Sequence, residues 1–146
     1  MGDAVNIREI KREDAQEIQE IRKAISDDDA QVDFVKFIEQ QSTDGDGKLS
    51  LVAEKDGAVV GYMVSTALYA GFGIRKSAWI MAIGVHPDCM GQGIGLKLGK
   101  AICDIYRTKG LETIYSSVLW DSTDVLSFFK KLGFERSDFI NLKKKL

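Results

Sequence analysis

The chain has 146 residues, of which 45% are hydrophobic and 29% are charged, and its formal net charge at pH 7 is −2. This length and composition predict a single domain, residues 1–146, with a substantial hydrophobic core. The slight negative charge argues against nucleic-acid binding, and no apolar run is long enough to cross a membrane. We expect a cytoplasmic protein, because the first residues also lack the charged-then-apolar layout of a signal peptide.

The spacing of apolar residues predicts ten elements along the chain. Alternating or continuous apolar runs indicate strands, and apolar residues three and four apart indicate amphipathic helices. The expected strands are residues 5–10, 49–54, 59–66, 77–85, 113–119 and 139–146. The expected helices lie around residues 18–25 and 34–38, and over 93–107 and 121–132. The order β-α-α-β-β-β-α-β-α-β predicts an α/β fold in which helices flank both faces of a mixed sheet.

The most informative segment lies between the fourth strand and the third helix, where three glycines stand at alternate positions. Gly91, Gly93 and Gly95 follow Pro87 and open an amphipathic helix. Glycine lets the backbone approach a ligand closely, and the first N–H groups of a helix lack partners within the helix and lie at its positive end. The segment therefore predicts an anion site, best suited to a diphosphate.

Two common phosphate-binding loops fit this segment poorly. A Walker loop that begins at Gly91 requires its second glycine at Leu96, and a dinucleotide-binding G-x-G-x-x-G motif requires its third glycine at the same position. The segment also lies past the middle of the chain, whereas the dinucleotide motif normally follows the first strand. A nucleotide-binding α/β protein is therefore the weaker alternative.

The stretch from Val85 to Gly95 resembles motif A of the GNAT superfamily of N-acetyltransferases. A hairpin over residues 51–62 and a motif B-like segment from Phe128 to Phe134 follow the same family order. The resemblance covers the whole chain and implies a GNAT-type mixed, splayed β-sheet. It also implies acetyl-CoA as cosubstrate, no metal, and acetyl transfer to a primary amine by direct attack in a ternary complex.

The resemblance assigns CoA binding to the fourth strand, the glycine segment and motif B. The implied residues are Ile83, Val85, Met90, Gly91, Gln92, Gly93, Ile94, Gly95, Ser122 and Phe129. Backbone groups of Ile83 and Val85 would hold the pantetheine arm, and an amide there would stabilise the oxyanion. Because Met90 replaces the usual Gln or Arg, we expect the loop to bind through backbone N–H groups.

The side chains that usually perform acid–base chemistry in this family are replaced. Ser117 stands at the place of a glutamate, Ser122 at that of an asparagine, and Phe129 at that of the motif B tyrosine. Tyr115 lies on the same strand face as Ser117 and is the substitute candidate for the acid that protonates the thiolate, although packing is the commoner role of a strand tyrosine. His86 is interpreted as support for the loop. A non-catalytic acyl-CoA binding or sensing module is therefore the alternative to an enzyme.

Other polar and aromatic features have simpler interpretations. The acidic run 27–29 suits helix capping and solvation, with attraction of a cationic amine as the alternative. Residues 42–50 resemble an EF-hand loop, but Ala53 occupies the position of the bidentate glutamate, so we interpret them as a connector. Asp121 is expected to cap the last helix, in which Val125, Phe128, Phe129 and Leu132 would face inward. Tyr62, Tyr69 and Trp79 are either core residues or the lining of an acceptor pocket.

The two cysteines and single histidine provide neither a disulfide framework nor a metal site. Cys89 is interpreted as a reduced loop residue, with redox sensitivity as the alternative, because a helix N-terminus stabilises a thiolate. We interpret residues 143–145, all lysines, as a solvated edge. The amine acceptor, either a small molecule or a protein, and the oligomeric state, including a homodimer, stay open at this point.

Overall fold

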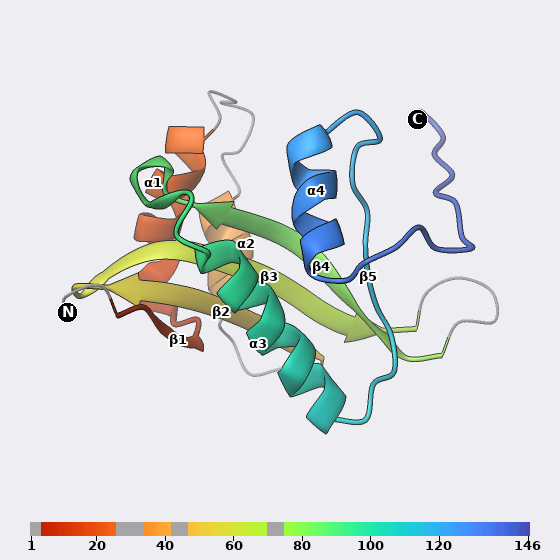
Figure 1. Ribbon diagram of the computed structural model, residues 1–146, viewed down its shortest axis with the longest axis horizontal. Helices are drawn as coiled ribbons and strands as arrows, with labels where there is room; N and C mark the ends of the chain where they lie inside the picture. The colour runs from red at the N-terminus through yellow and green to blue at the C-terminus, as the bar shows by residue number, and fades with distance from the viewer. Residues whose placement is uncertain (1–3, 26–33, 42–46, 70–74) are drawn as a thin grey trace.

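The computed structural model describes residues 4–25, 34–41, 47–69 and 75–146, which contain a five-stranded mixed sheet with helices on both faces (Figure 1). The strands are β1 (Asn6–Glu9), β2 (Lys48–Lys55), β3 (Ala58–Leu68), β4 (Ser77–Val85) and β5 (Ile114–Ser116). The helices are α1 (Ala15–Ile25), α2 (Phe34–Gln41), α3 (Ile94–Thr108) and α4 (Thr123–Lys131), with short 3-10 turns η1 (Arg12–Asp14) and η2 (Pro87–Cys89). The predicted α/β architecture is confirmed.

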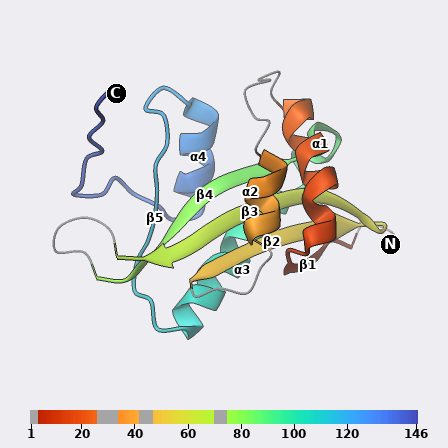
Figure 2. The ribbon, with the colours of Figure 1, turned by 180° about the vertical axis from the view of Figure 1, so that it is seen from behind.

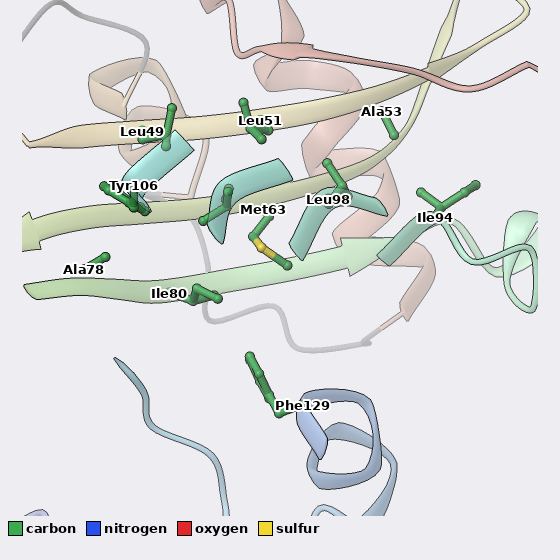
Figure 3. Packing of buried hydrophobic residues seen from close by; sticks show 11 residues of the cluster. Leu49, Leu51, Ala53, Met63, Ala78, Ile80, Ile94, Leu98, Tyr106 and Phe129 are labelled. Atoms are coloured by element: carbon green, nitrogen blue, oxygen red, sulfur yellow. The ribbon is translucent and has the colours of Figure 1, made fainter. Parts of the chain in front are cut away.

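Strand order in the sheet follows the chain from β1 to β5, and side-chain alternation divides the core between its two faces. Leu51 and Met63 belong to the cluster under α3, whose buried helix residues are Ile94, Leu98, Ile102 and Tyr106 (Figure 3). Val52 and Val64 belong instead to the cluster of α1 and α2, which cover the opposite face (Figure 2). Neighbouring residues of one strand therefore serve different cores, as the two-residue period of a strand requires.

The sheet opens between β4 and β5. Strands β1 to β4 are antiparallel, and β4 pairs with β3 along its whole length. By contrast, β5 runs parallel to β4 and pairs with it only from Ala78 to Ile80. Met81 is an extra residue in β4, because Val64 pairs with Ala82 and Ser65 with Ile80. The bulge bends β4, and beyond Ile80 the described residues provide no strand along the edge of β4 that faces β5.

An ion-pair network fixes β1 against the first helical turn. The Arg8 guanidinium donates two hydrogen bonds of 2.8 Å to the Asp14 carboxylate and a third to Glu54 on β2. The Lys11 N–H donates to the same Asp14 carboxylate at 2.7 Å, whose side chain is only 6% exposed. Burial alone would raise the pKa of Asp14, but the hydrogen bonds from Arg8 and Lys11 outweigh it and hold the pKa below its ordinary value of 3.8.

Three predictions about the C-terminal third are wrong. Residues 139–146 form no strand, and residues 135–146 make no backbone–backbone hydrogen bond within the described part of the chain. Alternation predicts which side chains share a face, but a strand also needs a partner edge in reach. The N-cap position of α4 is held by Ser122 rather than Asp121. Val125 is exposed, because only the Phe128–Phe129 side of this short helix meets the core.

Candidate functional site: the glycine loop and the open edge of β4

The chain leaves β4 through η2 and enters a loop whose glycines have two different roles. Gly91 and Gly93 adopt left-handed conformations with φ of 83° and 76°, which L side chains rarely adopt. Nothing lies within 4 Å of a Cβ built at either position. A Cβ at Gly95 would instead lie 2.9 Å from Cε1 of Phe128 on α4. Gly91 and Gly93 thus shape an open loop, whereas Gly95 lets α3 pack against α4.

Unpaired backbone donors concentrate at the start of α3. Within the described chain, no backbone N–H group from Gly91 to Leu96 donates a hydrogen bond to another residue, and the first donor is the Lys97 N–H, 3.0 Å from the Gly93 carbonyl oxygen. These donors lie at the positive end of a 15-residue helix. Such an arrangement binds anions through backbone groups and without any particular side chain.

Side chains at the loop support its shape and add positive charge. The Lys55 ammonium, at the end of β2, donates a hydrogen bond of 3.0 Å to Oε1 of Gln92. Nδ1 of His86 accepts a hydrogen bond of 3.1 Å from the Asp88 N–H, which stabilises the η2 turn. Met90 is 56% exposed. The sequence alone did not point to Lys55, because this residue lies beside a hairpin turn, far from the loop along the chain.

The open edge of β4 leads directly to this loop. The His86 N–H bonds to the Val60 carbonyl oxygen at 2.8 Å, so His86 directs its backbone groups towards β3. Because alternate residues of a strand direct their N–H and C=O groups to opposite edges, Val85 and Ile83 direct theirs away from β3. They therefore face the gap that opens beyond Ile80, and an extended ligand there would be able to add to β4 as another strand does.

Tyr115 lies on β5 in an aromatic cluster. Its ring stacks on Trp79 with a centroid distance of 4.8 Å, and Phe139 meets it edge-on at 6.1 Å. Among the described residues, the Tyr115 hydroxyl takes part in no hydrogen bond. Two residues further along, Ser117 accepts a hydrogen bond of 2.9 Å from the Asn141 side chain. Tyr115 is thus packed through its ring, while its hydroxyl is not committed to another residue of the described chain.

The two residues implied by motif B lie on α4. Phe129 of α4 (Figure 3) is only 5% exposed. Its ring packs between those of Phe128 and Phe134. Ser122 is half-buried at the start of α4, and its carbonyl oxygen accepts from the Leu126 N–H at 3.0 Å. Phe129 is therefore a core residue, and the backbone of Ser122 lies at the start of α4.

The two tyrosines on and directly after β3 differ in their exposure. Tyr62 is buried, which raises the pKa of its hydroxyl to about 12, whereas Tyr69 is 76% exposed. Residues 27–29 and 42–46 lie outside the described residues. No group of three or more metal-ligating side chains occurs in the part of the chain that is described. None of its helices is long and apolar enough to cross a membrane.

Comparison with known proteins identifies the fold in which the sheet opens beside the start of α3. The model of the Acetyltransferase (GNAT) family matches residues 7–134. The chain belongs to this family. Its membership supports an acetyltransferase and does not favour the non-catalytic alternative.

Solved structures with the same fold cover almost the whole chain. Aminoglycoside N-acetyltransferase AAC(6')-Iy, in complex with CoA, is 19% identical with a TM-score of 0.83, and the match covers 99% of this chain and 97% of that one. Aminoglycoside 6'-N-acetyltransferase AAC(6')-Ih from Acinetobacter baumannii is 18% identical with a TM-score of 0.82, covering 98% and 99%. Ribosomal-protein-alanine N-acetyltransferase from Brucella melitensis biovar Abortus 2308 is 18% identical with a TM-score of 0.78, covering 98% and 99%.

Proposed function

We propose that this protein transfers the acetyl group of acetyl-CoA to a primary amine by direct attack in a ternary complex. The observation that carries the proposal is the run of N–H groups from Gly91 to Leu96 that have no acceptor in the described chain. This run continues from the open edge of β4. A diphosphate and an extended amide-containing arm are the two parts of CoA that such a site suits.

Each part of the site has a separate task. The amides between Gly91 and Leu96 hold the diphosphate, and Lys55 adds charge beside them. The Ile83 and Val85 backbone groups pair with the pantetheine amides, which fixes the direction of the arm. Bound acetyl-CoA supplies an activated thioester carbonyl. An N–H group on the same edge donates to the carbonyl oxygen as negative charge develops there, an effect worth roughly 10²–10³ in rate.

The acceptor amine must reach the site without its proton. A lysine or polyamine nitrogen has a pKa of about 10.4, so for such an acceptor a water molecule or a carboxylate has to accept the proton. Holding both reactants in place contributes roughly 7–11 kcal/mol to lowering the barrier. This contribution exceeds that of a single acid or base, which is about 10²–10⁴ in rate. Catalysis therefore survives the replacement of the family's usual acid–base residues.

The proposed reaction requires an acceptor that carries an amine. The names of the compared enzymes place their acceptors in two classes, aminoglycosides and a ribosomal protein alanine. At 18–19% identity these structures support the fold, and the acceptor of this chain has to be determined by experiment.

The test measures cofactor binding first and transfer second. We expect CoA to raise the melting temperature, and acetyl-CoA to release free thiol when an amine from a panel of aminoglycosides, polyamines, amino acids and peptides is added. Tight CoA binding with no thiol release across the panel would favour an acyl-CoA sensor. A thermal shift with NAD or ATP and none with CoA would overturn the assignment.

Tyr115→Phe tests the proposed proton donor without removing the packed ring. If the hydroxyl protonates the leaving thiolate, kcat should fall by about 10²-fold or more, while the Kd for CoA stays unchanged. Tyr69→Phe is the matched control, because Tyr69 is 76% exposed. Equal kcat values for Tyr115→Phe and the unmodified protein would show that Tyr115 is only a packing residue.

A further inference from the structure

The gap between β4 and β5 is closed at one end. The last residues that pair across the two strands are Ile80 and Ser116, and the Ser116 hydroxyl donates a further hydrogen bond of 3.2 Å to the Ile80 carbonyl oxygen. Beyond this pair, the chain that follows β5 diverges from β4 (Figure 1). At its other end, where β4 ends at Val85, the gap leads to the glycine loop. A ligand arm that enters from the loop therefore ends at the Ile80–Ser116 pair.

Met81 is the first residue of β4 beyond the closed end, and it is the extra residue of the bulge. Ile80 belongs to the cluster under α3, whereas Ala82, two residues later, packs against the cluster of α1 and α2. In a regular strand the side chains alternate between the two faces, so the alternation slips at Met81. Met81 pairs with no residue of β3, as an extra residue in a bulge does not. Neither core cluster contains it.

The side chain of Met81 is left partly uncovered by the described residues. It is 47% exposed, although its neighbour Ile80 is only 5% exposed. The first residue beyond the pair on the other side of the gap is Ser117, which is small and polar and accepts a hydrogen bond of 2.9 Å from Asn141. Met81 is therefore the residue that offers a large apolar side chain at the closed end, and its unbranched thioether chain adapts to whatever lies against it.

The proposed function brings the acyl group of the cosubstrate to this closed end. The acyl group is carried at the end of the CoA arm that is remote from the diphosphate. With the diphosphate at the start of α3 and the arm along Val85 and Ile83, the thioester reaches the neighbourhood of Met81. Tyr115, the proposed proton donor to the thiolate, pairs with Trp79 in the row next to the Ile80–Ser116 pair. The proposed proton donor is thus at the same end of the gap as the thioester.

On the basis of that function, we propose that Met81 determines the size of the acyl group that the protein accepts. The Ile80–Ser116 pair blocks any extension of the acyl chain along β4, and the Met81 side chain limits the space beside it. Each methylene added to an acetyl group has to displace one of these, and forcing extra methylenes into filled space is unfavourable. The donor class is therefore a short-chain acyl-CoA, and Met81 is a specificity-determining residue.

The test compares the binding of CoA, acetyl-CoA and butyryl-CoA by titration calorimetry, which requires no knowledge of the acceptor. In the unmodified protein butyryl-CoA should bind about 10-fold more weakly than acetyl-CoA, the scale on which extra methylenes are penalised in filled space. Met81→Ala should reduce this difference to about 2-fold or less, because the truncation leaves room for the longer chain. Met81→Trp should weaken acetyl-CoA by about 10-fold, while the affinity for CoA, which carries no acyl group, is retained.

Two control variants separate acyl selection from a general effect of substitution. Met81→Leu approximately conserves the side-chain volume, so it should keep the discrimination of the unmodified protein. Leu68→Ala removes a 37% exposed apolar side chain at the end of β3 that pairs with Ser77, at the opposite end of β4 from the loop. It should also keep the ratio of the acetyl-CoA and butyryl-CoA affinities.

The failure of this inference is distinguishable from that of the proposed function. Absence of CoA binding to the unmodified protein would overturn both. If CoA binds but acetyl-CoA and butyryl-CoA have equal affinities for the unmodified protein, the acyl pocket alone is wrong. A ratio that stays the same in Met81→Ala and Met81→Trp, or that changes as much in Leu68→Ala, would likewise show that Met81 does not select the acyl group.

Discussion

Gly93→Val is expected to lower the affinity for CoA by about 100-fold, which corresponds to about 2.7 kcal/mol. Gly93 has a φ of 76°, and a β-branched residue at such a φ is strongly disfavoured. The backbone would have to rotate, which redirects the N–H groups at the start of α3. Hydrogen bonds from such groups to a charged partner are each worth about 1.5–3 kcal/mol. Isothermal titration with CoA measures the change.

Gly110→Val is the matched control for this experiment. Gly110 has a φ of 86°, and nothing lies within 4 Å of a Cβ built there, but it follows the opposite end of α3. Its substitution introduces the same kind of backbone strain without touching the loop, so the melting temperature should fall while the affinity for CoA is retained. If both variants lose affinity equally, general destabilisation explains the result and the glycine loop is not the CoA site.

Arg8→Met is expected to lower the free energy of unfolding by about 3–5 kcal/mol, because it leaves the buried Asp14 carboxylate without its partner. Arg12→Met is the control, since the Arg12–Glu39 pair is equally short at 2.9 Å but Arg12 is 73% exposed. Removal of such a surface pair costs about 1 kcal/mol or less. Urea denaturation measures both values. Similar losses in the two variants would show that the network around Asp14 contributes no more than a surface pair.

The same network predicts how acid affects stability. Because the pKa of Asp14 in the folded protein lies below 3.8, its contribution is complete above that pH and is lost as the pH falls towards the lower folded value. In Arg8→Met, the guanidinium no longer offsets the effect of burial on the pKa of Asp14. Protonation of Asp14 in acid should therefore remove an unpaired buried charge. The gap in unfolding free energy between the two proteins should therefore narrow in acid. A gap that stays constant from neutral pH to below 3.8 would argue against this role of Asp14.

Much of the candidate site follows from local sequence. The left-handed glycines, the proline turn and the amphipathic helix are all consequences of short-range backbone preferences, so Gly91 and Gly93 were identified together with the start of α3. The order of the glycine loop, the hairpin and motif B along the chain was sufficient to indicate the family. Gly95 looked equivalent to them, but its role depends on Phe128 from another helix, which local sequence does not contain.

By itself the sequence determined the order of elements as far as α4, the bounds of β4, and the glycine loop that opens α3, because these depend on contacts between near neighbours in the chain. Only the tertiary structure decided three other features. The first is the opening of the sheet beyond Ile80, and the second is the packing of Tyr115 on Trp79. The third is that residues 139–146 pair with no strand of the described chain. All three depend on which strand edges meet in space, and alternation of side chains carries no information about that.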